Sequence, residues 1–214
     1  MAAKGLGRNS QTSGDPDSPL QKMLKVAAVI VLFPLVAGLV KGLIDQINGL
    51  DAASVPVYWG FAAYLLIHLF ILEPLEFYKN TQRFLEYILG VFSPLFRVSY
   101  YIMPFWALVV LAAYFIAAAF LGSDNIRSIF YFLTTLVFTM HVVMVARLLR
   151  TDELREIFDY LFVIFIVFVL NVLFFSLNMR LYNPGFSVTA VTGEGLAFIK
   201  WSLAALADAA SGGS

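Results

Sequence analysis

The chain has 214 residues, of which 61% are hydrophobic and only 13% are charged, and this composition is too apolar for a soluble domain of that size. Fourteen Lys and Arg residues balance fourteen Asp and Glu residues, so the net charge provides no basic surface for nucleic acid. Because there is no cysteine, disulfides, cysteine-based metal sites and thiol catalysis are excluded. We expect an all-α, multi-pass membrane protein.

Residues 1–21 are rich in glycine, proline and polar side chains, which predicts a disordered cytoplasmic tail. Residues 22–182 are predicted to form the transmembrane domain. A helix needs about 20 mainly apolar residues to cross a hydrocarbon core of about 30 Å. Five segments meet this requirement: Leu24–Ile44, Val55–Leu72, Val98–Leu121, Ile126–Leu149 and Ile157–Met179.

The connection between the second and third predicted spans, residues 74–97, has helical periodicity, with an apolar stripe on one side and charged residues on the other. We expect an amphipathic helix in a hairpin on the cytoplasmic membrane surface. Its charged side would contact lipid headgroups or a cytoplasmic partner, and it carries Glu76, Lys79, Arg83 and Glu86.

After the fifth predicted span, residues 183–210 are expected to form an outer-face turn and a last helix over Glu194–Asp208. This segment is short for a span and carries Lys200 and Trp201 in its middle, which favours an interfacial helix on the outer leaflet. A sixth span over residues 194–210 is the alternative, and it would place the C-terminus inside. Residues 211–214 are predicted to be a flexible end.

The distribution of Lys and Arg predicts the orientation of the chain. Cytoplasmic connections carry an excess of these residues. With the N-terminus inside, the tail and the inner ends of the spans hold most of them, and the outer ends hold only Lys41, Arg127, Arg180 and Lys200. We therefore expect the N-terminus inside and the C-terminus outside, in the cytoplasmic membrane if the source is prokaryotic.

Small residues that allow close backbone approach mark helix contacts in lipid. The first predicted span offers Pro34, Gly38 and Gly42 at intervals of four, and the third offers Ala113 and Ala117. We expect these faces to pack within the chain, and packing against another subunit is the alternative.

The two histidines, His68 and His141, fall in the second and fourth predicted spans. They lie about 7.5 and 9 Å from the inner edges, at 1.5 Å per residue, so their depths match. Two imidazoles at one level can ligate a haem. The histidine pair and the helix count loosely resemble five-helix membrane cytochromes with quinone sites, and this resemblance implies haem b. The favoured interpretation is that each histidine is neutral and hydrogen-bonded to a neighbouring helix, with no cofactor.

Asn171 and the Thr134–Thr135 pair are polar groups at mid-depth, where no acidic residue falls, and a small-solute or proton carrier built on Asn171 is a further alternative. Metalloprotease and serine-hydrolase motifs are absent. The favoured hypothesis is a non-catalytic subunit that packs against and positions components of a larger membrane complex. Its expected partners are the lipid bilayer and other membrane subunits.

Overall fold

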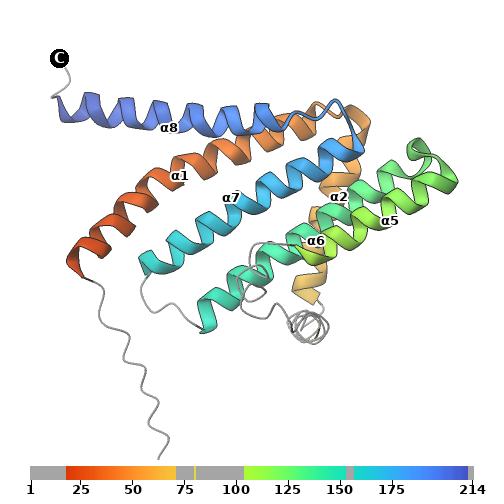
Figure 1. Cartoon of the computed structure of the whole chain (residues 1–214), viewed down its shortest axis with the longest axis horizontal. Coiled ribbons are helices and arrows are strands. Elements are labelled where there is room, and N and C mark those ends of the chain that lie inside the picture. Colours follow the sequence, from red (N-terminus) through yellow and green to blue (C-terminus); the bar gives the residue numbers. More distant parts are fainter. Residues whose placement is uncertain (1–17, 71–79, 81–103, 153–156, 212–214) are drawn as a thin grey trace, which may run out of the picture.

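The computed structural model describes residues 18–70, 80, 104–152 and 157–211, and this part of the chain is helical without a strand (Figure 1). The all-α prediction is therefore confirmed. The elements in chain order are α1 (Pro19–Asn48), the short 3-10 helix η1 (Asp51–Ala53), α2 (Ser54–Phe70), α5 (Phe105–Leu121), α6 (Ser123–Asp152), α7 (Ile157–Tyr182) and α8 (Val188–Ala210).

Four helical segments are long and apolar enough to cross a membrane, which is compatible with an integral membrane protein. They are α1, η1 together with α2, α6 over Ser123–Leu149, and α7. Helix α5 is also apolar and has 17 residues. The span predicted over Val98–Leu121 begins outside the described residues, so a fifth crossing stays a prediction, as does the orientation.

Two helix starts lie ahead of their predicted positions because capping residues set them. Ser18 and Gln21 form a capping box, in which each side chain accepts a hydrogen bond from the other residue's backbone N–H, so α1 begins at Pro19. At α8 the Ser187 hydroxyl accepts from the backbone N–H of Ala190, so this helix begins at Val188. The segment predicted as an interfacial helix is thus the greater part of a 23-residue helix.

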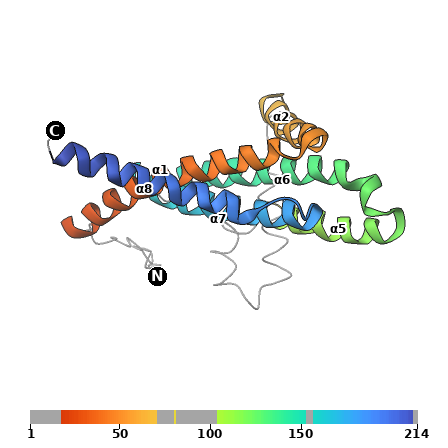
Figure 2. The same ribbon diagram turned by 90° about the horizontal axis from the view of Figure 1, so that it is seen from above.

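The helices form an elongated bundle in which α1 and α7 lie side by side, as do α2 and α6, and α5 and α6 (Figures 1 and 2). Gly122 alone separates α5 from α6, and its φ of +79° is a conformation that favours glycine. Helix α8 turns back after α7 and crosses α1 in the opposite direction (Figures 1 and 2). The first and last described helices therefore pack against each other.

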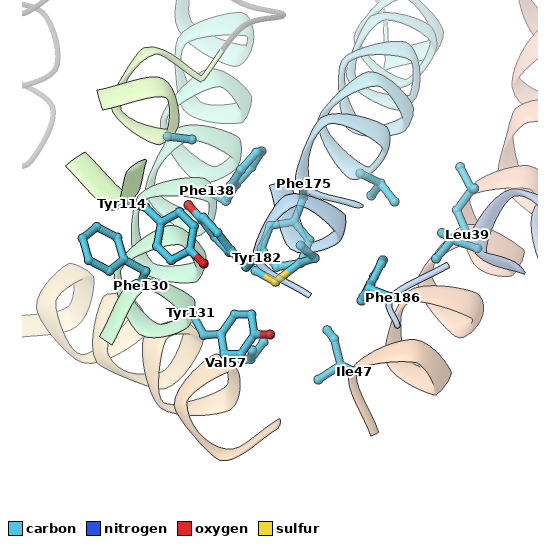
Figure 3. Close-up of a cluster of buried hydrophobic side chains, with 14 of the residues drawn as sticks. Leu39, Ile47, Val57, Tyr114, Phe130, Tyr131, Phe138, Phe175, Tyr182 and Phe186 are labelled. Carbon is cyan, nitrogen blue, oxygen red and sulfur yellow. The ribbon is translucent and has the colours of Figure 1, made fainter. Parts of the chain in front are cut away.

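An aromatic core joins α5, α6 and α7, as Figure 3 shows. The ring of Tyr114 lies 4.6 Å from that of Tyr182 and 5.3 Å from that of Phe130, both in edge-on arrangements. Phe138 and Phe175 pair in the same way at 5.0 Å. The high aromatic content of the sequence therefore serves interior packing as well as the outer surface.

Candidate functional site

One close helix contact involves the two glycines that the sequence places four residues apart on α1. A Cβ atom at Gly38 would lie 2.5 Å from the Glu194 carbonyl oxygen, and one at Gly42 would lie 2.9 Å from the Cα of Val191. From the α8 side, a Cβ at Gly195 would lie 3.0 Å from the Leu35 side chain. At Gly38 and Gly42 the nearest atoms include the backbone of α8, so glycine on α1 is what lets the two helices touch there. We call this contact the α1–α8 seam.

Polar contacts flank the α1–α8 seam. The Lys41 ammonium lies 3.1 Å from the Glu194 carboxylate on α8 and 2.7 Å from the Asp45 carboxylate one turn further along α1. The Gln46 side-chain oxygen accepts a 2.7 Å hydrogen bond from the backbone N–H of Ser187, the N-cap of α8. These contacts hold the start of α8 against the C-terminal third of α1.

A second ion pair ties the other end of α1 to α7. The Lys25 ammonium lies 2.7 Å from the Asp159 carboxylate, and the two side chains are 29% and 21% exposed. The sequence predicts Lys25 only as one of the positive residues at the inner end of the first span and does not predict its partner. The pair joins helices that are distant in the chain, and no periodicity in the sequence signals such a contact.

The other predicted packing residues have different environments. Pro34 is buried in α1, and Ala117 is partly buried against the aromatic core. Ala113 is exposed, and the side of α5 that packs on the core carries the buried Tyr114 instead. The sequence analysis missed Gly60 on α2, where a Cβ atom would collide with the Phe132 carbonyl oxygen of α6. This lone glycine has no partner four residues away to signal it.

The four charged residues of the predicted cytoplasmic hairpin lie outside the described residues. They are Glu76, Lys79, Arg83 and Glu86, and the expectation that they contact headgroups or a partner stays a prediction.

The two histidines are placed differently from each other. His141 is 3% exposed on α6. His68 is partly buried on α2, its Nδ1 lies 3.5 Å from the Tyr64 hydroxyl, and the two rings stack at 5.8 Å. Within the described ranges, no three His, Asp or Glu side chains gather as a metal site would require. The haem hypothesis for His68 and His141 stays a prediction.

A cavity of about 430 Å³ lies between α1, α2, α6 and α7. Neither histidine lines it. Its walls are almost entirely aliphatic and aromatic, and the polar residues among them are Tyr58, Thr135, Thr139 and Asn171. The volume lies within the range of about 300–1,000 Å³ that is typical of small-molecule sites.

Asn171, which the sequence marks as a polar group at mid-depth, is 1% exposed and lines this cavity. Its side-chain Nδ2 donates to the Val167 carbonyl at 2.8 Å, and its Oδ1 has no hydrogen-bond partner among the described residues. Asn178 on the same helix repeats this pattern, donating to the Phe174 carbonyl with its Oδ1 unpaired, but it does not line the cavity.

The hydroxyl of Thr134 on α6 forms a buried 2.8 Å hydrogen bond with the Tyr182 hydroxyl of α7. Thr135 and Thr139 instead donate to carbonyl oxygens of their own helix, at 2.9 and 2.7 Å. Of the pair predicted at mid-depth, Thr134 therefore joins two helices, whereas Thr135 is hydrogen-bonded within its own helix.

A scan against protein-family models finds no match to this chain, and searches of curated proteins and of solved structures find none either. The function has to be inferred from the residues of the chain and their arrangement.

Proposed function

We propose that this chain is a non-catalytic integral membrane subunit that packs against and positions other components of a larger membrane complex. The observation that carries the proposal is the use of charged and small residues to fix helices to one another. Lys25 pairs with Asp159 across α1 and α7, and Lys41 pairs with Glu194 across the α1–α8 seam. Both pairs join separate helices of the chain, so they support a rigid bundle that offers a fixed surface to other subunits.

The outward surface of the bundle supports the same proposal. Large apolar side chains are exposed on every described α-helix, for example Phe33 at 65%, Trp59 at 62% and Phe120 at 84%. Lipid tails and the apolar helices of a partner both suit such a surface. Helix α8 is the favoured partner surface, because beyond its seam with α1 it exposes Leu203 and Leu206 at 51% and 55%.

In this proposal the chain crosses the membrane five times, and α1 starts on the cytoplasmic side. The third pass consists of α5 together with residues that precede Phe105. The excess of Lys and Arg at the predicted inner ends supports this orientation. Helix α8 then begins on the outer side, next to the C-terminal end of α1.

The test is to extract the chain at native abundance into a mild detergent and to measure the mass of the intact complex. We expect a second protein in fixed stoichiometry. The double variant Leu203→Ala/Leu206→Ala should release it, because it removes apolar contacts from α8. The matched control Leu65→Ala/Leu66→Ala truncates two exposed leucines of α2 and should retain the partner.

Recovery of only a fully functional monomer or homo-oligomer would overturn the proposal. Two further measurements address the alternatives on the same preparation. A Soret band that shifts on reduction with dithionite would favour the haem hypothesis, and solute or proton flux in proteoliposomes would favour the carrier.

A further inference from the structure

The C-terminal half of α8 has no packing partner among the described helices. The α1–α8 seam reaches Phe198, and every residue from Leu203 to Ala209 is exposed. This half of the helix extends away from the bundle (Figures 1 and 2). Packing of one face against another element supplies most of the stability of helices in proteins. Within the described chain, that packing is missing from this half of α8.

Two charged residues on the same half of α8 have no ion pair within the described ranges. Lys25, Lys41 and Arg127 each pair with a carboxylate of their own chain. Lys200 and Asp208 are exposed, and neither forms an ion pair with a described residue. Their charges are opposite, and they lie about 12 Å apart along the helix at 1.5 Å per residue.

The two charges are placed symmetrically about Ala204. Each lies four residues from it, so at 3.6 residues per turn each points about 40° to one side of it. Ala204 comes two and a half turns after Gly195 of the α1–α8 seam and therefore faces away from α1. We call the surface formed by Lys200, Ala204 and Asp208 the Ala204 face.

The Ala204 face is complementary to itself. If two copies of α8 meet in antiparallel orientation with Ala204 at a two-fold axis, Lys200 of each copy lies opposite Asp208 of the other. Two ion pairs then form in one contact. The small side chain at its centre lets the two backbones approach closely, as the glycines do at the α1–α8 seam.

The membrane restricts which symmetric contacts are possible. Two copies that insert in the same direction are related by a two-fold axis along the membrane normal. Such an axis makes two helices antiparallel only where they lie along the membrane surface. The interfacial position that the sequence predicts for α8 allows this arrangement.

We propose that the Ala204 face of α8 binds the same face of a second copy of this chain in antiparallel orientation. The inference rests on the interfacial placement of α8 and goes beyond the partner subunit proposed above. Leu203 and Leu206 point about 100° or more away from Ala204, so the dimer leaves them for that partner.

The first test uses Ala204→Cys, which places the single cysteine of the chain at the proposed two-fold axis. The purified full chain is reconstituted in phosphatidylcholine vesicles at decreasing protein-to-lipid ratios and oxidised with copper phenanthroline, and the covalent dimer is measured on non-reducing gels. A disulfide needs Cα atoms about 4.4–6.8 Å apart, so we expect a dimer whose yield does not fall on dilution with lipid.

The matched control is Leu196→Cys, which introduces a cysteine at another exposed position of α8. In the proposed dimer its two copies lie about 24 Å apart along the helices, which is too far for a disulfide. Leu196→Cys should therefore form only the dimer that random collision produces, and dilution with lipid should remove it.

The second test reverses each charge in the Ala204→Cys chain. Lys200→Glu alone, or Asp208→Lys alone, places like charges opposite each other at both ends of the contact, so dimer formation should weaken about tenfold. When the two variants are mixed with different tags, both ion pairs are restored between them. The heterodimer should then exceed either homodimer, a preference that binding of a lipid phosphate to Lys200 would not produce.

Equal oxidation of Ala204→Cys and Leu196→Cys would overturn the proposal, and so would loss of the Ala204→Cys dimer on dilution. Absence of a heterodimer preference would contradict the assigned ion pairs. Disulfide formation needs no charge variant, and both cysteines replace exposed side chains, so the first test does not depend on a disruptive substitution. Because the purified chain contains no other subunit, these outcomes are independent of the proposed complex.

Discussion

Substitution of Gly38 by alanine should separate α1 from α8. The added Cβ would lie 2.5 Å from the Glu194 carbonyl oxygen, 2.8 Å from the Gly195 Cα and 2.9 Å from the Phe198 Cβ, whereas ordinary contacts lie at 3.4–4 Å. Backbone atoms and a Cβ cannot rotate away, so α8 must move by about 1 Å, and such a gap already forfeits a quarter to a half of each van der Waals contact.

Overpacking of this kind costs about 1–3 kcal/mol, and the rigid neighbours of Gly38 place Gly38→Ala near the upper end. At Gly42 the three nearest atoms lie at 2.9–3.0 Å, so Gly42→Ala should cost less. The control is Gly193→Ala on α8, where nothing lies within 4 Å of the added Cβ. Alanine is a better helix former than glycine by about 1 kcal/mol, so this control should be neutral or stabilising.

The assay is reversible unfolding with SDS in mixed micelles, followed by the fluorescence of the three tryptophans, one of which, Trp201, lies on α8. The expected order of stability is Gly193→Ala, then Gly42→Ala, then Gly38→Ala. If Gly38→Ala unfolds at the same SDS concentration as Gly193→Ala, the backbones do not touch at Gly38 and the described α1–α8 seam is incorrect.

Three further predictions concern ion pairing, hydrogen bonding and topology. Lys25→Met and Asp159→Asn should each destabilise the bundle by about 1–2 kcal/mol in the SDS assay, and the double variant should cost less than the sum because the two charges are coupled. Tyr182→Phe removes the hydroxyl that bonds to the buried Thr134, so it should lower the free energy of unfolding by about 1–2 kcal/mol. A smaller loss in the SDS assay would contradict the Thr134–Tyr182 hydrogen bond. Single cysteines at Ser18 and Asn48, which bound α1 in this cysteine-free chain, should react with a membrane-impermeant maleimide from opposite sides, and reaction from one side would contradict the proposed crossing by α1.

Hydropathy was sufficient to predict the long apolar helices, because a membrane-length run of apolar residues is a local property of the sequence. The helix ends were less accurate. The capping box at Ser18 and the N-cap at Ser187 lie outside the apolar windows, so α1 and α8 begin earlier than expected. A prediction that combined capping signals with hydropathy would have placed both starts correctly.

The candidate site could be predicted only in part. The sequence marked Gly38 and Gly42 as a packing face and Asn171 as a polar group at depth, because spacing and residue type are visible in one dimension. Which helix meets that face, which carboxylate meets Lys25, and which of the polar groups borders a cavity all depend on the arrangement of helices in space. No local pattern contains that information, since α1 and α8 meet at residues 153 positions apart.

The order of synthesis separates two effects of the α1–α8 seam. Membrane-spanning helices insert individually and then associate, and α8, which is not one of the five proposed passes, is synthesised after every other described helix. Gly38 and Gly42 of α1 are therefore exposed to lipid until α8 has been synthesised. The Lys41–Glu194 pair can form only at that final step. Gly38→Ala should accordingly leave the amount of protein in the membrane fraction unchanged while it lowers the resistance to SDS. A parallel fall in both quantities, compared with Gly193→Ala, would show that Gly38 acts during insertion and not in the packing of α8.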